Sequence, residues 1–276
     1  MSAASTADAA APAASPGRRI RVVRRPMSRR TTLLLSAASS VGFLVAWELA
    51  SRTGLLDARF FPAPTAVAAA LAEAVANGEL FGHLGMSLSR IAVGFVIGAV
   101  PAVLLGLVMA LVPVVRALVQ PLIDATFPIP KLAILPLFIL VFGLGETSKY
   151  LVIAVTVFYI VLVNTVSGVA GIETARFEVA ASFGASRRMT FFDVALPGAL
   201  PMIIAGLKLG MNVALLVIVA VEFTGAESGL GYLIWNSWQV FQIEQMYVGL
   251  ATTALLGFAS AALFALLEKW LVPWKS

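Results

Sequence analysis

The sequence predicts an all-α protein that crosses a membrane several times. Three runs, residues 91–115, 150–172 and 246–267, contain no Asp, Glu, Lys, Arg or His. Each run reaches or exceeds the roughly 20 residues that an α-helix needs to cross a bilayer. Hydrophobic residues make up 60% of the 276-residue chain and charged residues only 12%, against about 25% charged residues in soluble domains. A transmembrane β-barrel would need short strands of alternating hydrophobicity, and that pattern is absent.

The N-terminal region predicts a tail, one span and a connector. Residues 1–30 are rich in Ala, Ser and Pro and end in a stretch with seven arginines, so we expect a disordered basic tail. The first span follows over residues 31–52. Residues 53–83 form a mostly polar connector, in which FPAPTAVAAALAEAV (61–75) predicts a proline-initiated helix lying at the membrane interface.

Residues 84–268 hold the other five predicted spans. We expect them at about 91–112, 125–143, 150–172, 197–222 and 246–268. The segment 113–130 contains four prolines and therefore predicts a kinked or partly re-entrant approach to the third span. GLGETSK (143–149) predicts a tight turn, with Thr147 or Ser148 as the N-cap of the fourth span. Residues 269–276 form the C-terminal tail.

The distribution of positive charge predicts the orientation of the chain. Six spans place both termini on the same side of the membrane. With that side cytoplasmic, fourteen Lys and Arg residues are inside and four are outside, while Lys131 falls within the third span. This asymmetry agrees with the positive-inside rule. The segment between the fourth and fifth spans, 173–196, is then cytoplasmic, and the net charge of +5 does not indicate nucleic-acid binding.

Several kinds of chemistry are excluded by what the chain lacks. It has no cysteine and one histidine, His83, so we expect no disulfide and no metal site. An intramembrane enzyme would need a nucleophile–base pair or an H-E-x-x-H motif within a span, and neither occurs. The chain also lacks the G-x-x-x-x-G-K-[ST] phosphate-binding loop. We therefore expect it to bind neither ATP nor any other cofactor itself.

A polar segment between the fourth and fifth predicted spans reads EVAASFGASRRMTFFDVALP (178–197). It predicts two short helices. Thr174 is the expected N-cap of the first helix, and Gly184 suits the left-handed conformation that ends it. Ser186 is the expected N-cap of the second helix, 187–195. Because of its fixed φ, the proline that closes the segment suits the first turn of the fifth span.

One face of the first short helix carries small side chains. Phe177, Ala180, Ala181 and Gly184 follow the i, i+3, i+4, i+7 spacing of a single helix face. Small residues would let another surface approach the backbone closely, and Glu178 lies beside this face near the helix N-terminus, where a carboxylate is favoured. The residues alone leave a second interpretation open, an amphipathic loop that packs on its own protein.

The same segment resembles the EAA loop in permease subunits of bacterial ATP-binding-cassette (ABC) importers. That loop reads Glu-Ala-Ala, three residues, Gly, nine residues, Ile, one residue, Leu-Pro. The matching residues are Glu178, Ala180, Gly184, Leu196 and Pro197. Val179 replaces the first alanine of the motif and Val194 replaces its isoleucine. In the family, this loop is the coupling helix that docks into a groove on the cytoplasmic ATPase.

Three more segments resemble the branch of the family that transports nitrate, taurine and aliphatic sulfonates. They are HLGMSLSRIAVGF (83–95), PIPKLAILPLFILVFGLGETSKY (128–150) and AVEFTGAESGLGYLI (220–234). The resemblance covers about residues 80–270. It implies a type I importer permease with six transmembrane helices and a cytoplasmic coupling helix between spans four and five. The ATPase-coupling residues that it implies are Phe177, Glu178, Ala180, Ala181, Gly184, Arg187, Leu196 and Pro197.

The resemblance also implies a function and a set of partners. The chain would form the translocation path for a small solute, an anion such as a sulfonate, taurine or nitrate. Its partners would be a cytoplasmic ABC ATPase dimer that binds the ATP, an extracytoplasmic solute-binding protein, a second permease copy in a homodimer, and membrane lipid. Its location would be the bacterial inner membrane. The alternative is a self-sufficient secondary transporter or channel, which usually has ionisable residues deep in its spans and internal repeats; neither is evident.

Polar residues inside membrane spans are costly and often functional, so they are the candidates for the path. They are Asn164, Ser167, Asn212, Glu222 and Lys131. The alternative for the two asparagines and the serine is hydrogen bonding between helices. Thr156 is expected to bond to its own preceding turn. Because the spans contain few cations, we expect specificity to lie largely in the solute-binding protein.

Overall fold

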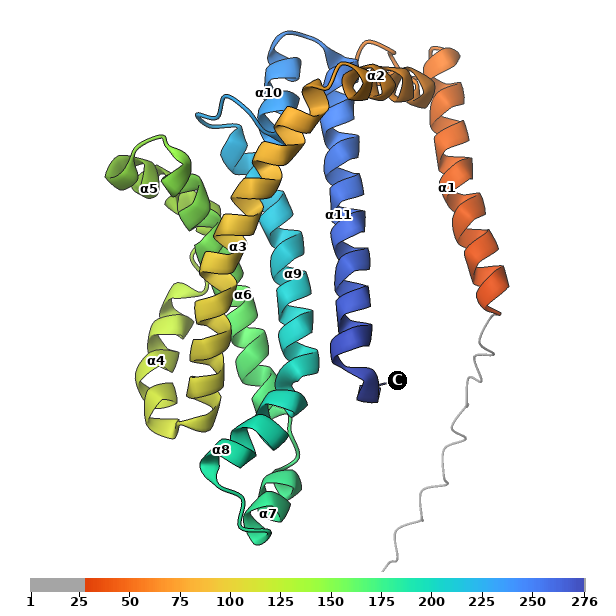
Figure 1. Ribbon diagram of the computed structural model, residues 1–276. Helices are drawn as coiled ribbons and strands as arrows, with labels where there is room; N and C mark the ends of the chain where they lie inside the picture. Colours follow the sequence, from red (N-terminus) through yellow and green to blue (C-terminus); the bar gives the residue numbers. More distant parts are fainter. Residues whose placement is uncertain (1–27, 276) are drawn as a thin grey trace, which may run out of the picture. The chain divides into compact units, whose positions relative to one another are not determined.

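A computed structural model describes residues 28–275 of the chain, and all of its regular secondary structure in that range is helical (Figure 1). The predicted all-α class is therefore confirmed. The chain divides into two units, residues 1–46 and 47–276, which are treated separately below. Most of the predicted basic tail, residues 1–27, lies outside the described residues.

The first unit contains most of helix α1 (Arg29–Arg52). This helix covers the predicted first span and is apolar enough over Arg30–Arg52 to cross a membrane. Ser28 accepts a hydrogen bond from the backbone N–H of Thr31 at 3.1 Å and so satisfies one free donor of the first turn.

The second unit begins with the last turn of α1 and helix α2 (Pro64–Ala76), which forms where an interfacial helix is predicted. Its proline occupies the first turn, where a missing N–H costs nothing. The Glu48 carboxylate accepts a hydrogen bond from the backbone N–H of Thr65 at 3.0 Å. Ala74 packs into a cluster with Leu80, Leu230, Leu233 and Val248, which anchors α2 to the helices described next.

Four long helices form the body of this unit: α3 (Glu79–Leu111), α6 (Glu146–Ala170), α9 (Leu196–Glu222) and α11 (Ile243–Leu271). Figure 1 shows α3 and α6 running in the same general direction and crossing each other, and α9 running back beside α6 in the opposite direction. The centre of the bundle is apolar, with Val157, Val161 and Ala214 fully buried.

Glycines let these helices approach closely. On α3, Gly94, Gly98 and Gly106 recur at four- and eight-residue spacing against α6, and a Cβ at Gly98 would overlap the carbonyl group of Ala154. On α9, a Cβ at Gly206 would lie 2.6 Å from the Cβ of Asn164. Small residues at four-residue spacing are a common way for membrane helices to pack, so this pattern lets α6 pack closely between α3 and α9.

The predicted third span is two short helices rather than one. Helix α4 (Pro113–Thr126) is followed by η1 (Lys131–Ile134) and α5 (Leu135–Phe142), and the two arms meet at 87°. The prediction of a kinked approach agrees with this bend, but the expected continuous helix over 125–143 is wrong. Prolines at 128 and 130 explain the break, because they remove backbone donors and disfavour helix in the preceding residue. The described residues thus contain five long spans, or six with the bent pair.

The segment between α6 and α9 has the two-helix form that was predicted. It comprises α7 (Thr174–Ser182), α8 (Arg187–Met189) and a π-helical stretch, η2 (Thr190–Ala195), that continues into α9. Gly184 adopts φ +70° and ends α7. The Ser186 side chain caps α8 by accepting from the N–H of Met189 at 3.3 Å, while Pro197 lies in the first turn of α9.

Two predicted caps are wrong, and one loop contains an unexpected helix. Helix α7 begins after Glu173 without a side-chain cap, so Thr174 is already helical. Helix α6 begins after Gly145, and the Ser148 hydroxyl instead donates to the carbonyl of Gly143 at 2.5 Å. The segment after α9 contains α10 (Leu230–Gln239), and the chain ends in η3 (Pro273–Lys275).

Candidate functional site

The segment α7–α8 projects from one end of the helical bundle (Figure 1). One side of α7 faces its own protein, since Phe177 and Ala180 are half-buried. Phe177 lines a cavity of about 630 Å³ together with Leu111, Val112 and Pro113 at the α3–α4 junction. The sequence places Phe177 and Ala180 on the contact face for another protein, but in the structure these two side chains lie partly against the bundle.

The other side of α7–α8 exposes apolar side chains. Phe183 is 88% exposed, Val179 56% and Met189 53%. Glu178 and Ala181 are exposed on the same short helix. Several exposed apolar side chains on a segment that projects from the bundle are typical of a protein interaction site. Sequence reasoning missed Val179 and Phe183; the available signal was a phenylalanine directly before the left-handed glycine of an otherwise polar loop.

The remaining predicted coupling residues connect this surface to α9. Gly184 and Arg187 are exposed, and Leu196 and Pro197 are half-buried at the start of α9. From Arg187 to Glu222 the chain is helical without a break, and Ala195 is fully buried at the junction. One continuous helical segment therefore joins α8 to the far end of α9, although it changes direction at η2 (Figure 1).

The polar candidates within α6 and α9 occupy different surroundings. Asn164 is half-buried, and its Nδ2 donates to the carbonyl of Ile160 at 2.8 Å. Thr156 is buried and donates to the carbonyl of Val152 at 2.8 Å, as predicted. Ser167 and Asn212 are exposed. Asn212 lines a groove of about 570 Å³ between α9, α10 and α11 that is otherwise mostly apolar.

Lys131 lies at the bend between α4 and α5. Its Nζ donates to the carbonyl oxygens of Thr126 at 2.7 Å and Phe127 at 3.1 Å. The same ammonium group lies 3.9 Å from the ring centre of Tyr159, a favourable cation–π arrangement. These contacts join the C-terminal end of α4 to α6. Asp124 lies in α4, before the bend, and Lys131 lies after it.

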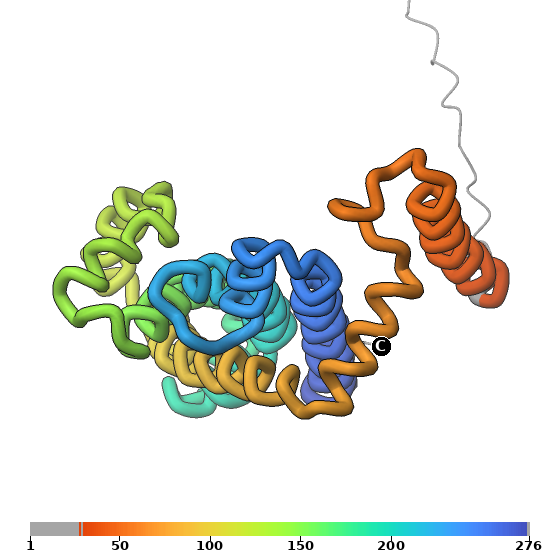
Figure 2. Tube along the Cα trace, turned by 90° about the horizontal axis from the view of Figure 1, so that it is seen from above, coloured from red at the N-terminus to blue at the C-terminus, as the bar shows by residue number. Residues whose placement is uncertain are grey.

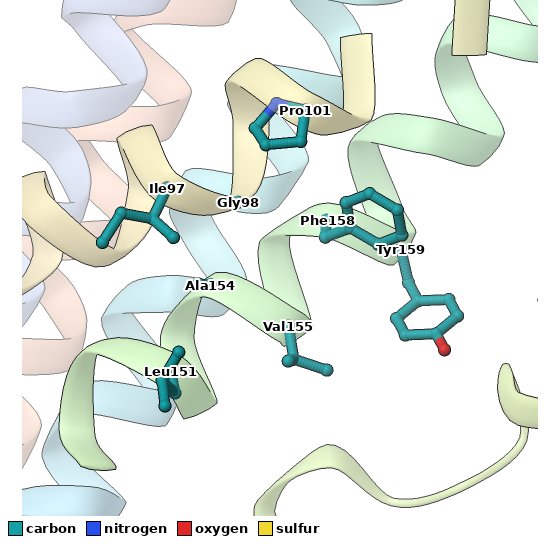
Figure 3. A pocket seen from close by; sticks show the side chains of 8 residues that line it. All are labelled: Ile97, Gly98, Pro101, Leu151, Ala154, Val155, Phe158 and Tyr159. Atoms are coloured by element: carbon teal, nitrogen blue, oxygen red, sulfur yellow. The ribbon is translucent and has the colours of Figure 1, made fainter. Parts of the chain in front are cut away.

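Tyr159 also lines a groove between α3 and α6 (Figure 3). This groove has a volume of about 340 Å³, and its walls include Ile97, Pro101 and Phe158. Apart from the Tyr159 hydroxyl, the lining side chains are apolar. The groove therefore suits an apolar group better than an anion.

Glu222 is fully buried within a cluster of charged and polar groups. Its carboxylate accepts from Nη1 of Arg90, from the hydroxyl of Ser87 and from the backbone N–H of Gly231, each at 2.8 Å. Arg90 and Lys149 are buried as well, although the sequence places both among the external charges. Among the described residues, no hydrogen bond or ion pair joins any two of the five path candidates.

The helical spans define a multi-span membrane protein with one projecting segment, and comparisons with known proteins identify its family. Residues 102–275 match the family described as binding-protein-dependent transport system inner membrane component. The chain belongs to this family and is the permease component of an ABC importer. It is a multi-pass inner-membrane protein, and the predicted family is confirmed.

Individual relatives agree with this assignment. The chain is 31% identical over 255 residues to the putative aliphatic sulfonates transport permease protein SsuC of Bacillus subtilis (strain 168), covering 92% of each chain. It is 32% identical over 256 residues to the taurine transport system permease protein TauC of Escherichia coli (strain K12), covering 91% of this chain and 92% of TauC. A crystal structure of an amino acid ABC transporter with histidines shares the fold, with a TM-score of 0.56, 22% identity, and coverage of 68% of this chain and 91% of that one.

Proposed function

We propose that this chain forms the translocation path for a small sulfonate, such as taurine or an aliphatic sulfonate. The similarity to SsuC and TauC, whose names state these substrates, supports the proposal. A solute-binding protein would deliver the sulfonate, and a cytoplasmic ATPase dimer would bind ATP and supply the energy. The permease itself would need no cofactor.

The surface that includes Val179, Phe183 and Met189 is the proposed docking site for the ATPase. This places α7–α8 and both termini in the cytoplasm, as the distribution of Lys and Arg also favours. The exposed Arg187 beside this surface adds positive charge. The single observation that carries the proposal is the 88% exposure of Phe183 on a segment continuous with α9.

Closure of the ATPase dimer would move α7–α8 in two copies of the permease. The movement would travel along the helical segment from Arg187 to Glu222 and pass to α6 through the close contact at Gly206. Large apolar side chains on α9 and α11, such as Leu216 and Phe258, are exposed to lipid or a second permease copy. We expect that copy to be identical, which gives a homodimer.

Affinity purification of the permease in mild detergent tests the docking site. The ATPase should co-purify with the unaltered chain and be largely lost from Phe183→Asp, because a charge on the docking surface would meet an apolar partner. Leu55→Asp is the matched control, because Leu55 is 81% exposed in the connector before α2, far from α7. Equal recovery of the ATPase with both variants would contradict the proposal.

The substrate is tested through the binding protein that co-purifies or is encoded beside the permease. Calorimetric titration with taurine, ethanesulfonate and nitrate should give binding of a sulfonate and none of nitrate. Binding of nitrate alone would exclude the sulfonate proposal while leaving the ATP-driven importer intact.

A further inference from the structure

Two segments from distant parts of the chain meet at the end of the bundle opposite α7–α8. One is the α5–α6 turn, residues 143–146, and the other is the α9–α10 connection, residues 223–229. A Cβ placed at Gly225 would lie 2.9 Å from Cδ2 and 3.9 Å from Cβ of Leu144. Figure 2 views the bundle from this end and shows the chain after α9 lying across it beside α3.

Arg90 of α3 holds both segments. Its Nε and Nη2 donate to the two carboxylate oxygens of Glu146 at 2.6 and 2.8 Å. Its Nη1 donates to the backbone carbonyl of Ser228 at 2.5 Å and to Glu222 at 2.8 Å. A planar guanidinium with several fixed donors can make such a bridge, whereas a lysine cannot.

The two carboxylates that share Arg90 differ in burial. The Glu222 side chain is 0% exposed and the Glu146 side chain is 40% exposed. Gly229 lies so close to Glu222 that a Cβ at this position would overlap the carboxylate. Removing a partner from a fully buried pair leaves an uncompensated charge at high cost. If Arg90 and Glu146 separated, the Glu146 carboxylate would reach water and would keep its bond from Lys149 at 2.9 Å. This pair therefore opens at lower cost than the Arg90–Glu222 pair.

The two segments lie at the far ends of α6 and α9, the helices between which the proposed coupling segment lies. Helix α6 runs from Glu146 to the start of the segment, and α9 runs from its end to Glu222. A tilt of α6 relative to α9, driven at α7–α8, would change the separation of Leu144 and Gly225 at the far end.

We propose that Arg90 is the positioning residue of an outer gate formed by residues 143–146 and 223–229. The Arg90–Glu146 pair closes the turn onto the connection. It separates in each transport cycle, while the Arg90–Glu222 pair remains. This inference rests on the proposed function, which places α7–α8 inside and this end of the bundle outside.

A disulfide between the two segments measures the state of the gate. The chain has no cysteine, and the Cβ separation of 3.9 Å at Leu144 and Gly225 lies within the range that a disulfide requires. The double variant Leu144→Cys/Gly225→Cys would be purified with its ATPase and binding protein. We expect rapid cross-linking without nucleotide and a several-fold lower yield when ADP–vanadate traps the ATPase. Equal yields in the two states would overturn the gate.

A second set of variants tests the role of Arg90. In the double-cysteine chain, Glu146→Gln should lower the cross-linking yield of the resting complex several-fold and abolish its dependence on nucleotide. Arg90→Lys should produce at least as large a drop, because a lysine cannot bridge both segments. Glu79→Gln, an exposed acid at the same end of the bundle, should leave both yields unchanged. A purely structural role for Arg90 would change the amount of folded complex and leave the nucleotide dependence intact.

The outcomes separate the gate from the function on which it rests. If binding protein stimulates ATP hydrolysis but cross-linking is the same in both states, the gate is rejected and the importer function is retained. If no ATPase joins the complex, both proposals are rejected. Because Gly225 has φ +69°, a cysteine there is strained; the pair Leu144→Cys/Ala226→Cys, joined by a short bismaleimide, provides the same comparison without that strain.

Discussion

Arg90 and Glu222 are 132 residues apart in the sequence, yet Nη1 of Arg90 lies 2.8 Å from the Glu222 carboxylate and both side chains are buried. This pair joins α3 to the end of α9. Ser87 and Gly231 complete the bonding of the carboxylate.

Removing one partner of this pair should destabilise the fold. We expect Glu222→Ala to lower the free energy of unfolding by about 3–5 kcal/mol, since Arg90 would then lose its buried counter-charge. The melting temperature of the detergent-purified protein measures this loss. The double variant Arg90→Met/Glu222→Met should recover part of it, and a double variant no more stable than Glu222→Ala would argue against a buried pair.

The glycines of α3 give a second prediction, on helix packing. Gly98→Ala would push a Cβ into the carbonyl of Ala154 and should destabilise the protein by about 1–3 kcal/mol. Gly82→Ala is the control on the same helix, because a Cβ there meets nothing within 4 Å, and it should be neutral or slightly stabilising. Equal thermal stability of both variants would contradict the packing described here.

The left-handed glycine of the proposed coupling segment gives a third prediction. Gly184 has φ +70° and open space around its Cα, so a substitution there acts on the backbone and not on packing. We expect Gly184→Val to reduce ATP-driven uptake strongly while the protein still folds, and Gly184→Asn to retain most uptake, because asparagine tolerates this conformation. Uptake in proteoliposomes checks both, and full activity of Gly184→Val would disprove the coupling role.

Lys131 gives a fourth prediction, which tests whether its side chain contacts the solute or only stabilises the fold. Its ammonium group already bonds two carbonyls and faces the Tyr159 ring. We therefore expect Lys131→Met to lower the melting temperature and leave the taurine concentration for half-maximal uptake unchanged. A several-fold rise in that concentration would instead place Lys131 in contact with the anion.

Much of the fold could be predicted because its signals are local. Uncharged runs mark the long helices, and the Gly184, Ser186 and Pro197 positions follow from turn and cap chemistry. The spacing of Gly94, Gly98 and Gly106 is likewise a packing motif visible in the sequence.

The remaining features depend on contacts between distant residues. Arg90 and Lys149 count as external charges in a linear sequence, and only the fold brings them to Glu146 and Glu222. The orientation of α7 likewise depends on what covers Phe177, which the periodicity of one short helix does not reveal. The bend after α4 lies between these cases: its prolines predict a break but not an angle.

In the proposed function, α7–α8 receives energy from a separate ATPase to move a sulfonate through this chain. Uptake of radiolabelled taurine into proteoliposomes containing the purified complex and its binding protein tests it most directly. We predict uptake that requires both ATP and binding protein and is lost in Phe183→Asp. Uptake by the permease alone, driven by an ion gradient and unaffected by Phe183→Asp, would contradict it.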